Sequence, residues 1–250
     1  MLCQKKDAKK REKVRISLTA EGKMRLGGLM KMTLLDFPGR VACTVFTSGC
    51  GFRCPFCHNA SLVTHPESEL SVDDFFAFLK KRQGILDGVC VTGGEPLGQP
   101  DIAPFLRDIR ALGYAVKLDT NGVHSEALAA ILADGLVDYV AMDIKASPEK
   151  YPMTVGLTAM PTGVAESAAL LMRGATPFEF RTTVVEELHE PEDFSAIGKW
   201  IAGTERYFLQ RFTDSGDLIG EGLSQPSSEK MRACLAAVLP YVPTAALRGM

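Results

Sequence analysis

Short apolar runs rich in β-branched residues alternate with amphipathic helical patterns, and this alternation limits the fold more than any other feature. Six runs are predicted as strands, over residues 41–47, 88–92, 114–119, 137–144, 179–185 and 206–212. Helices are predicted over residues 72–82, 101–112, 125–133, 165–172, 191–201 and 227–238. Strands that are apolar along their length and separated by helices indicate an α/β fold with a parallel sheet covered by helices.

The residues alone are compatible with two arrangements of such a sheet: an open doubly wound sheet and a curved partial barrel. Both would place an active site at the carboxyl ends of the strands. Residues of types suited to ligand binding lie at the ends of successive predicted strands, and one more lies inside the fifth strand. They are Cys50, Gly93, Gly94, Glu95, Asp119, Asn121, Lys145 and Arg181. We therefore expect these side chains to converge on one rim of the sheet.

The overall charge of the 250-residue chain is −2, so no global field favours nucleic acid or an acidic membrane as a partner. No apolar stretch approaches the roughly 18 residues of a membrane span. Neither a signal peptide nor a cleavage site is visible, which indicates a cytoplasmic protein with reduced thiols. The seven cysteines are therefore interpreted as ligands or core residues rather than disulfides.

A basic run near the N-terminus is the local exception to this balance. Seven Lys or Arg residues lie between Lys5 and Arg15, against only Asp7 and Glu12. The run is either an RNA-binding or docking arm or a solvated tail, and the absence of interleaved aromatic residues favours a disordered tail. Residues 1–23 are therefore predicted as a disordered extension and residues 24–250 as one domain.

Three cysteines lie close together after the first predicted strand, in the segment Cys50-Gly-Phe-Arg-Cys54-Pro-Phe-Cys57-His58. Each thiolate can ligate one iron of a [4Fe–4S] cubane, and no fourth ligand lies nearby. The remaining iron would be open to the amino and carboxylate groups of a methionine moiety. The spacing therefore predicts a cluster that binds S-adenosylmethionine.

Two other metal sites fit part of this segment. Cys54, Cys57 and His58 match the C-x-x-C-H pattern of covalent haem attachment, which requires export from the cytoplasm. His58 could also complete a Cys₃His zinc site. Neither site explains the polar residues that follow the other strands, and the cluster remains the preferred interpretation.

The residues after the second, third and fourth strands suit a charged ligand. Gly93 and Gly94 would let the backbone approach a ligand and leave carbonyls free for its ammonium group. Asp119 is placed to accept from ribose hydroxyls or to ligate a cation. Alternation puts Asp143 and Lys145 on one face, and Lys145 would pair with the ligand's carboxylate.

Arg181 is a lone cation in a β run, a candidate for a carboxylate or a substrate backbone, with a surface position on an edge strand as the alternative. His58 adjoins the cysteines and would pack near adenine. The other histidines, His65, His124 and His189, are expected to be solvated. Cys90 and Trp200 are expected in the core.

Together these residues resemble the radical S-adenosylmethionine superfamily, and more closely its short activating enzymes for glycyl radical enzymes. Residues 27–39 and the run Cys57-His58-Asn59 are typical of the activating enzymes, in particular those for anaerobic ribonucleoside-triphosphate reductase. Such chains commonly begin near Met24, which suggests that translation starts there. They often carry Asn after the first cysteine, where this chain has Gly51, a change that would loosen the loop.

The resemblance implies a partial (β/α)6 barrel of parallel strands, one [4Fe–4S] cluster and one S-adenosylmethionine. It also implies a monovalent cation beside the methionine carboxylate, surrounded by Asp119, Thr120, Asp143 and the carbonyl of Ala141. The implied cofactor-binding set, apart from the cysteines, is Phe56, His58, Gly93, Gly94, Glu95, Asp119, Thr120, Asn121, Asp143, Lys145 and Arg181.

The implied activity is that of an oxidoreductase in which flavodoxin or ferredoxin reduces the cluster and S-adenosylmethionine is cleaved. The resulting radical would then take a hydrogen from the Cα of a glycine in a partner enzyme under anaerobic conditions. Two rival functions remain: a radical enzyme acting on a small molecule such as a deazapurine precursor, and a plain iron–sulfur electron carrier. The carrier predicts a fourth cluster ligand and no use for Lys145.

Overall fold

The predicted strands assemble into one curved sheet in a computed structural model that describes residues 24–66 and 69–249. The strands in sheet order are β1 (Leu26–Thr33), β2 (Ala42–Thr47), β3 (Gly88–Gly93), β4 (Ala115–Thr120), β5 (Tyr139–Asp143), β6 (Phe178–Val184), β7 (Tyr207–Arg211) and β8 (Ala246–Arg248). All neighbours from β2 to β8 pair in parallel. Strand order follows chain order without reversal, which selects the partial barrel over the doubly wound sheet.

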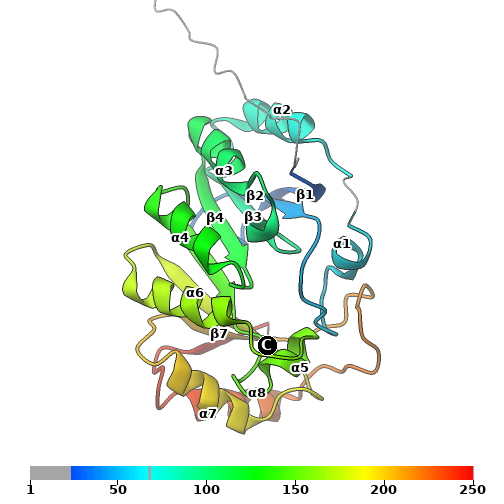
Figure 1. Cartoon of the computed structure of the whole chain (residues 1–250), viewed down its shortest axis with the longest axis vertical. Helices are drawn as coiled ribbons and strands as arrows, with labels where there is room; N and C mark the ends of the chain where they lie inside the picture. Colours follow the sequence, from blue (N-terminus) through cyan, green and yellow to red (C-terminus); the bar gives the residue numbers. More distant parts are fainter. Residues whose placement is uncertain (1–23, 67–68, 250) are drawn as a thin grey trace, which may run out of the picture.

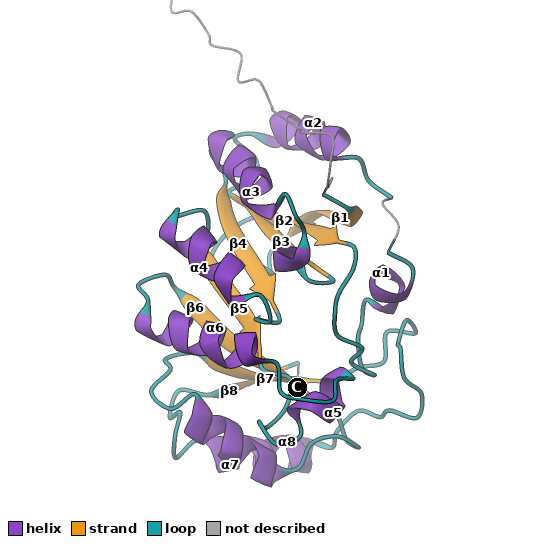
Figure 2. Cartoon of the chain, in the orientation of Figure 1, coloured by secondary structure: helices purple, strands orange, loops and turns teal. Residues whose placement is uncertain are grey.

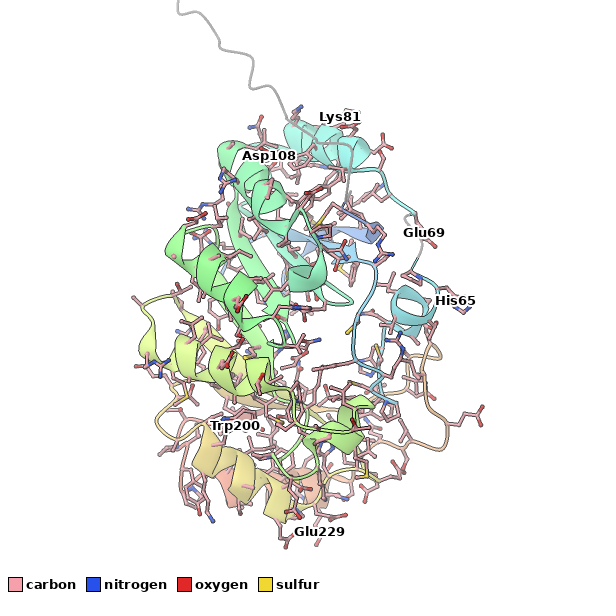
Figure 3. The ribbon with its side chains drawn as sticks, viewed as in Figure 1. His65, Glu69, Lys81, Asp108, Trp200 and Glu229 are labelled. Carbon is pink, nitrogen blue, oxygen red and sulfur yellow. The ribbon has the colours of Figure 1, made fainter. Side chains whose placement is uncertain are left out.

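Helices follow the strands, and most of them lie along the outer side of the curved sheet, whereas the short helices Ala60–Thr64 and Tyr151–Val155 lie apart from this layer (Figures 1 and 2). In chain order the helices are α1 (Ala60–Thr64), α2 (Val72–Arg82), α3 (Ile102–Ala111), α4 (Ser125–Ala133), α5 (Tyr151–Val155), α6 (Thr162–Arg173), α7 (Pro191–Trp200) and α8 (Ser228–Val238), with a short 3₁₀ turn at Pro96–Gly98. The predicted cap of α2 is confirmed, because the Ser71 hydroxyl accepts the Asp74 N–H at 3.0 Å. The charged side chains of Lys81 and Glu229 point outward at opposite ends of the molecule (Figure 3).

The core lies between the sheet and its helices. The strand residues Val45, Val89, Val116 and Val140 share one face of the sheet by their register and are fully buried there. Phe75 and Phe105 stack between α2 and α3, with ring centroids 5.4 Å apart. None of the helices within the described ranges is long and apolar enough to cross a membrane.

Four elements were not predicted from the sequence. β1 pairs antiparallel with β2, and two register shifts interrupt its alternation, between Leu26 and Gly28 and between Met30 and Thr33. α1 and α5 are single turns, and β8 is only three residues long. Segments this short carry too little periodicity to be recognised.

The predicted disordered extension, residues 1–23, lies outside the described residues. The start of translation at Met24 also stays a prediction. The proposal that residues 24–250 form one domain stays a prediction. Within the described ranges, β2 to β7 bring the carboxyl ends of six parallel strands to one rim, where the predicted site residues lie.

Candidate functional site

The three cysteines occupy the loop that leaves β2 and enters α1, and all three line one cavity of ≈ 230 Å³. Cys54 is buried, whereas Cys50 and Cys57 are half-buried. Backbone contacts shape the loop: the Cys57 N–H donates to the Cys54 carbonyl at 3.1 Å, and the Phe52 N–H donates to the Cys50 sulfur at 3.4 Å. The Arg53 guanidinium donates to the Cys50 carbonyl at 2.7 Å. The loop thus presents three sulfurs to the same space.

The chemistry of this donor set fits an iron–sulfur cluster. Burial raises the pKa of Cys54 to about 12 and also raises the pKa of Cys50, so these thiols would release their protons to solvent when they bind iron. Among the described residues, no group of three or more His, Cys, Asp or Glu side chains is arranged around a single ion. A cubane does not need such convergence, because each thiolate ligates its own iron.

His58 takes no part in a Cys₃His arrangement. Its ring stacks on Phe212, with centroids 5.4 Å apart and planes inclined by 12°. The zinc interpretation therefore loses its fourth ligand. Phe56 is almost fully buried, and the Lys145 ammonium lies 6.0 Å from the centre of its ring. His58 and Phe56 both line the cavity.

Gly93 and Gly94 end β3 against the start of the cysteine loop. Gly93 has a φ of 117°, and a Cβ there would lie 2.3 Å from the Thr47 nitrogen. A Cβ on Gly94 would lie 2.1 Å from the Gly49 carbonyl oxygen. These glycines therefore permit a close approach of the neighbouring backbone, at Thr47 and Gly49. Both glycines also line the cavity. The Asn59 amide donates to the Gly93 carbonyl at 3.2 Å.

Glu95 lies behind the rim, and the structure does not bring it to the cavity lining. It is 2 % exposed, and its carboxylate accepts from the Leu97 N–H at 3.0 Å and from the Thr120 hydroxyl and Asn121 N–H at 2.7 Å. Burial raises the pKa of Glu95 to about 7, although these three donors act against the shift. Its carboxylate therefore connects the end of β3 to the end of β4, and its predicted contact with the cofactor stays a prediction.

Thr120 and Asn121 line the cavity at the end of β4. The Asn121 amide donates to the Cys50 sulfur at 3.5 Å, and its oxygen accepts the Val123 N–H at 3.0 Å. Because Glu95 holds both residues, the end of β4 is joined to β3 and to the cysteine loop. These bonds give Asn121 one defined orientation.

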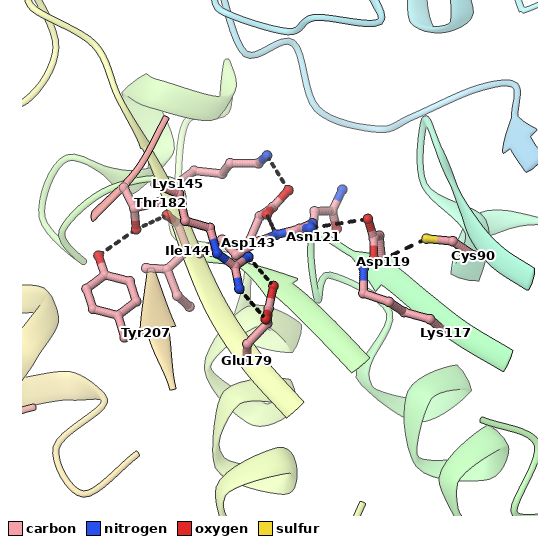
Figure 4. A network of polar contacts seen from close by, with 12 residues as sticks. Cys90, Lys117, Asp119, Asn121, Asp143, Ile144, Lys145, Glu179, Thr182 and Tyr207 are labelled. Carbon is pink, nitrogen blue, oxygen red and sulfur yellow. Dashed lines mark hydrogen bonds and ion pairs between the residues drawn. The ribbon is translucent and has the colours of Figure 1, made fainter. Parts of the chain in front are cut away.

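Charged side chains of alternating sign line the cavity across β4, β5 and β6 (Figure 4). The Arg181 guanidinium lies 3.0 Å from Asp143 and 3.3 Å from Asp119, and the Lys145 ammonium lies 2.9 Å from the second Asp143 oxygen. Burial alone would raise the pKa of Asp143, but Arg181 and Lys145 hold it well below its ordinary value. The same ion pairs hold the pKa of both cations above their ordinary values. Burial acts in the same way on Asp119, but Arg181 and Lys117 hold its pKa below the ordinary value, so all four groups are charged at neutral pH.

Arg181 is not a surface residue of an edge strand, because β6 lies between β5 and β7 and its side chain is largely buried. The prediction that His189 is solvated was wrong. It is fully buried, its Nδ1 accepts the Val185 N–H at 3.1 Å, and its Nε2 lies 2.9 Å from the Lys145 carbonyl. No sequence pattern distinguishes such a histidine from a solvated one.

Four polar residues of the cavity lining were missed from the sequence: Asn59, Thr92, Thr183 and Gln210. Thr183 and Gln210 are partners in the register between β6 and β7. Thr183 follows Arg181 by two residues and therefore shares its face of the strand. That alternation was the signal that would have found it.

The superfamily profile for radical SAM proteins matches residues 44–190, more than half of the chain. The chain belongs to the radical SAM superfamily. Its members use a [4Fe–4S] cluster and S-adenosylmethionine, which confirms these two of the predicted cofactors.

Known relatives of this radical SAM chain differ in how much of it they cover. A putative glycyl-radical enzyme activating enzyme of Methanocaldococcus jannaschii is 26 % identical over 233 residues, 90 % of this chain and 96 % of its own. A 7-carboxy-7-deazaguanine synthase of Halobacterium salinarum is 41 % identical over 87 residues, 33 % of each chain. A pyruvate formate-lyase-activating enzyme of Clostridium pasteurianum is 34 % identical over 130 residues, 48 % of this chain and 52 % of its own.

The solved structures add support for the fold. Streptococcus suis SuiB, in a crystal structure with the precursor peptide SuiA, superposes with a TM-score of 0.64 at 16 % identity. The match covers 82 % of this chain and 48 % of SuiB. The partial barrel that the resemblance implied is therefore the fold of the protein.

Proposed function

We propose that this radical SAM enzyme activates a glycyl radical enzyme by removing a hydrogen atom from one of its glycines. The observation that carries the proposal is the cavity itself, in which three cysteine thiols of one loop lie beside a set of paired charges on β4, β5 and β6. A full-length likeness to an activating enzyme supports the same function.

The chain's own residues would hold the cofactors in this cavity. Cys50, Cys54 and Cys57 would ligate a [4Fe–4S] cluster, which when bound supplies the electron that cleaves S-adenosylmethionine. Lys145 and Arg181 would bind the carboxylate of the methionine moiety, since both are charged and line the cavity. Asp119 would accept hydrogen bonds from ribose hydroxyls, and the Gly93 carbonyl would accept one from the ammonium group.

Phe56, Val63 and Phe52 contribute the apolar part of the cavity lining. They would limit the access of water to the reacting atoms, which protects a radical from side reactions. The cavity lining contains no histidine paired with a carboxylate, nor another arrangement typical of a general acid and base. Cofactor chemistry with positioning by the protein suits such a lining.

Anaerobic ribonucleoside-triphosphate reductase is the partner that we propose, with reduced flavodoxin or ferredoxin as the electron donor in the cytoplasm. The proposal rests on the resemblance of residues 27–39 and of the segment after Cys57 to activating enzymes for this reductase. No role for nucleic acid or a membrane is proposed.

A radical enzyme acting on a small molecule is the second candidate, because a 7-carboxy-7-deazaguanine synthase matches a third of the chain. The likeness to an activating enzyme extends over 90 % of the chain and favours a protein substrate. An electron carrier is disfavoured, since it has no use for the paired charges of Lys145, Asp143 and Arg181 that line the cavity beside the cysteines.

Electron paramagnetic resonance of the reduced, cluster-loaded protein mixed with the reductase and S-adenosylmethionine tests the proposal. We expect a glycyl radical doublet that is absent when the reductase glycine is replaced by alanine. Formation of 5′-deoxyadenosine without a doublet in any glycyl radical enzyme would favour the small-molecule function. No 5′-deoxyadenosine at all would favour the electron carrier.

A further inference from the structure

Lys117 on β4 is a buried lysine beneath the cavity, and neither the motif nor the proposed function accounts for it. Its side chain is 2 % exposed and does not line the cavity. Its ammonium pairs with one oxygen of Asp119 and lies 3.8 Å from the sulfur of Cys90 on β3. The contact with Asp119 is an ion pair in which Lys117 is the cation.

Lys117 completes a series of five charged side chains joined by ion pairs, of which Lys117, Asp119, Asp143 and Lys145 are labelled in Figure 4. One Asp119 oxygen pairs with Lys117 and the other with Arg181. One Asp143 oxygen pairs with Arg181 and the other with Lys145. Every carboxylate oxygen of the two aspartates thus has a cationic side chain beside it.

This arrangement does not fit the monovalent cation that the resemblance implies between Asp119, Thr120 and Asp143. An ion ligated by these carboxylates would lie close to ammonium and guanidinium groups and would be repelled by them. The Thr120 hydroxyl donates to Glu95 and accepts the Gly122 N–H at 3.0 Å, so it already has both a donor and an acceptor partner in the protein. The carboxylates have already gained their positive partners from the chain itself.

We propose that the Lys117 ammonium takes the place of a bound monovalent cation, so that S-adenosylmethionine binding requires none. The three cations exceed the two carboxylates by one charge, and the methionine carboxylate balances this excess at Lys145 and Arg181. Lys117 thereby neutralises Asp119 from below and leaves part of the Arg181 guanidinium for the cofactor. Lys117 is a positioning residue, because it acts through Asp119 and Arg181. The inference rests on the proposed cofactor contacts of the previous subsection.

Binding of S-adenosylmethionine to the cluster-loaded protein tests this inference without a measurement of activity. Equilibrium dialysis would be run under anaerobic conditions in sodium, potassium or choline chloride at one ionic strength. We expect the wild-type dissociation constant to be the same in the three salts. A loss of affinity of about tenfold or more in choline would overturn the inference.

Lys117→Met removes the ammonium with little change in side-chain length. We expect this variant to bind S-adenosylmethionine about tenfold or more weakly in choline, the size of effect typical for a partner behind a ligand-binding group. Sodium or potassium should restore part of the lost affinity, because the site then offers an unpaired carboxylate oxygen. Lys117→Arg retains a cation and should show no dependence on the salt.

Lys150→Met is the matched control, since Lys150 pairs with Asp193 at 2.6 Å and does not line the cavity. It should bind as the wild type does in every salt. Equal affinity of Lys117→Met and wild type in choline would also overturn the inference. If Lys117→Met does not fold, the wild-type comparison still decides. Failure of the wild type to bind in all three salts would overturn the proposed cofactor site and this inference with it.

Discussion

The Asn121 side-chain amide lies 3.5 Å from the Cys50 sulfur, so the end of β4 is tied directly to the first cysteine of the loop. The two residues are 71 positions apart in the chain. A hydrogen bond to a cysteine sulfur stabilises the reduced form of a cluster because it disperses negative charge.

Asn121→Ala should therefore lower the reduction potential of the cluster, by on the order of tens of millivolts. An anaerobic redox titration followed by electron paramagnetic resonance measures the change. Asn59→Ala is the matched control, because the Asn59 amide donates to the Gly93 carbonyl and not to a sulfur. Equal potentials in the two variants would show that the contact of Asn121 with Cys50 has no electronic effect.

Replacing Cys50, Cys54 or Cys57 by Ala should abolish both the cluster and the formation of 5′-deoxyadenosine, since each thiolate is assigned to one iron. Iron and sulfide analysis after reconstitution measures the first effect and chromatography the second. Cys234→Ala provides the comparison, because Cys234 is buried on α8 away from the cavity. Activity retained in any variant of the three cysteines would contradict the ligand set.

Lys145→Met should weaken the binding of S-adenosylmethionine by roughly 100-fold, about 3 kcal/mol, because it removes a charged partner of the methionine carboxylate and leaves Asp143 with one partner fewer. The cluster absorbance should not change. Lys150→Met again serves as the control. Loss of the cluster in Lys145→Met would make this residue structural.

Gly94→Ala should destabilise the protein by about 1–3 kcal/mol, the range typical of overpacking. The added Cβ would lie 2.1 Å from the Gly49 carbonyl oxygen, so the start of the cysteine loop would have to move. Gly51→Ala is the matched control, since a Cβ there meets nothing within 4 Å. Thermal unfolding and iron content measure both variants, and equal behaviour would show that the loop tolerates the shift.

The alternation of strands and helices sufficed to predict the parallel sheet, and the cysteine spacing predicted the cofactors. Both signals are local, because they depend on residues that are neighbours in the chain. The partners of each site residue were not predictable in this way. Glu95 follows two glycines in a cofactor-like motif, yet its carboxylate points to Thr120 and Asn121, which lie on another strand.

Lys117 is a second residue whose partners could not be predicted from the sequence. A lysine in an apolar strand does not indicate its partner. The pairing of β4 with β3 places Lys117 beside Cys90. The position of β6 allows Lys117 and Arg181 to pair with the same carboxylate, that of Asp119. Similarly, the burial of His189 depends on the Lys145 carbonyl, 44 positions away. Contacts between distant segments are set by the curvature of the sheet, which a local pattern does not contain.

Glu95 should make the stability of the protein depend on pH between its ordinary pKa of 4.5 and its folded pKa of about 7. In this interval the unfolded chain has released the carboxyl proton while the folded chain retains it, so folding takes up a proton. The stability contributed by Glu95 therefore falls as the pH rises, by up to about 3 kcal/mol across the interval.

Glu95→Gln should remove this dependence. It should also cost about 1–3 kcal/mol at pH 7.5, because both carboxylate oxygens accept from N–H or O–H donors and the amide presents a donor to one of them. Urea titrations of the cluster-free chain from pH 5 to 7.5 measure both effects. Glu229→Gln, at an exposed position on α8, is the control. Parallel stability curves for wild type and Glu95→Gln would show that the folded carboxyl titrates at its ordinary pKa.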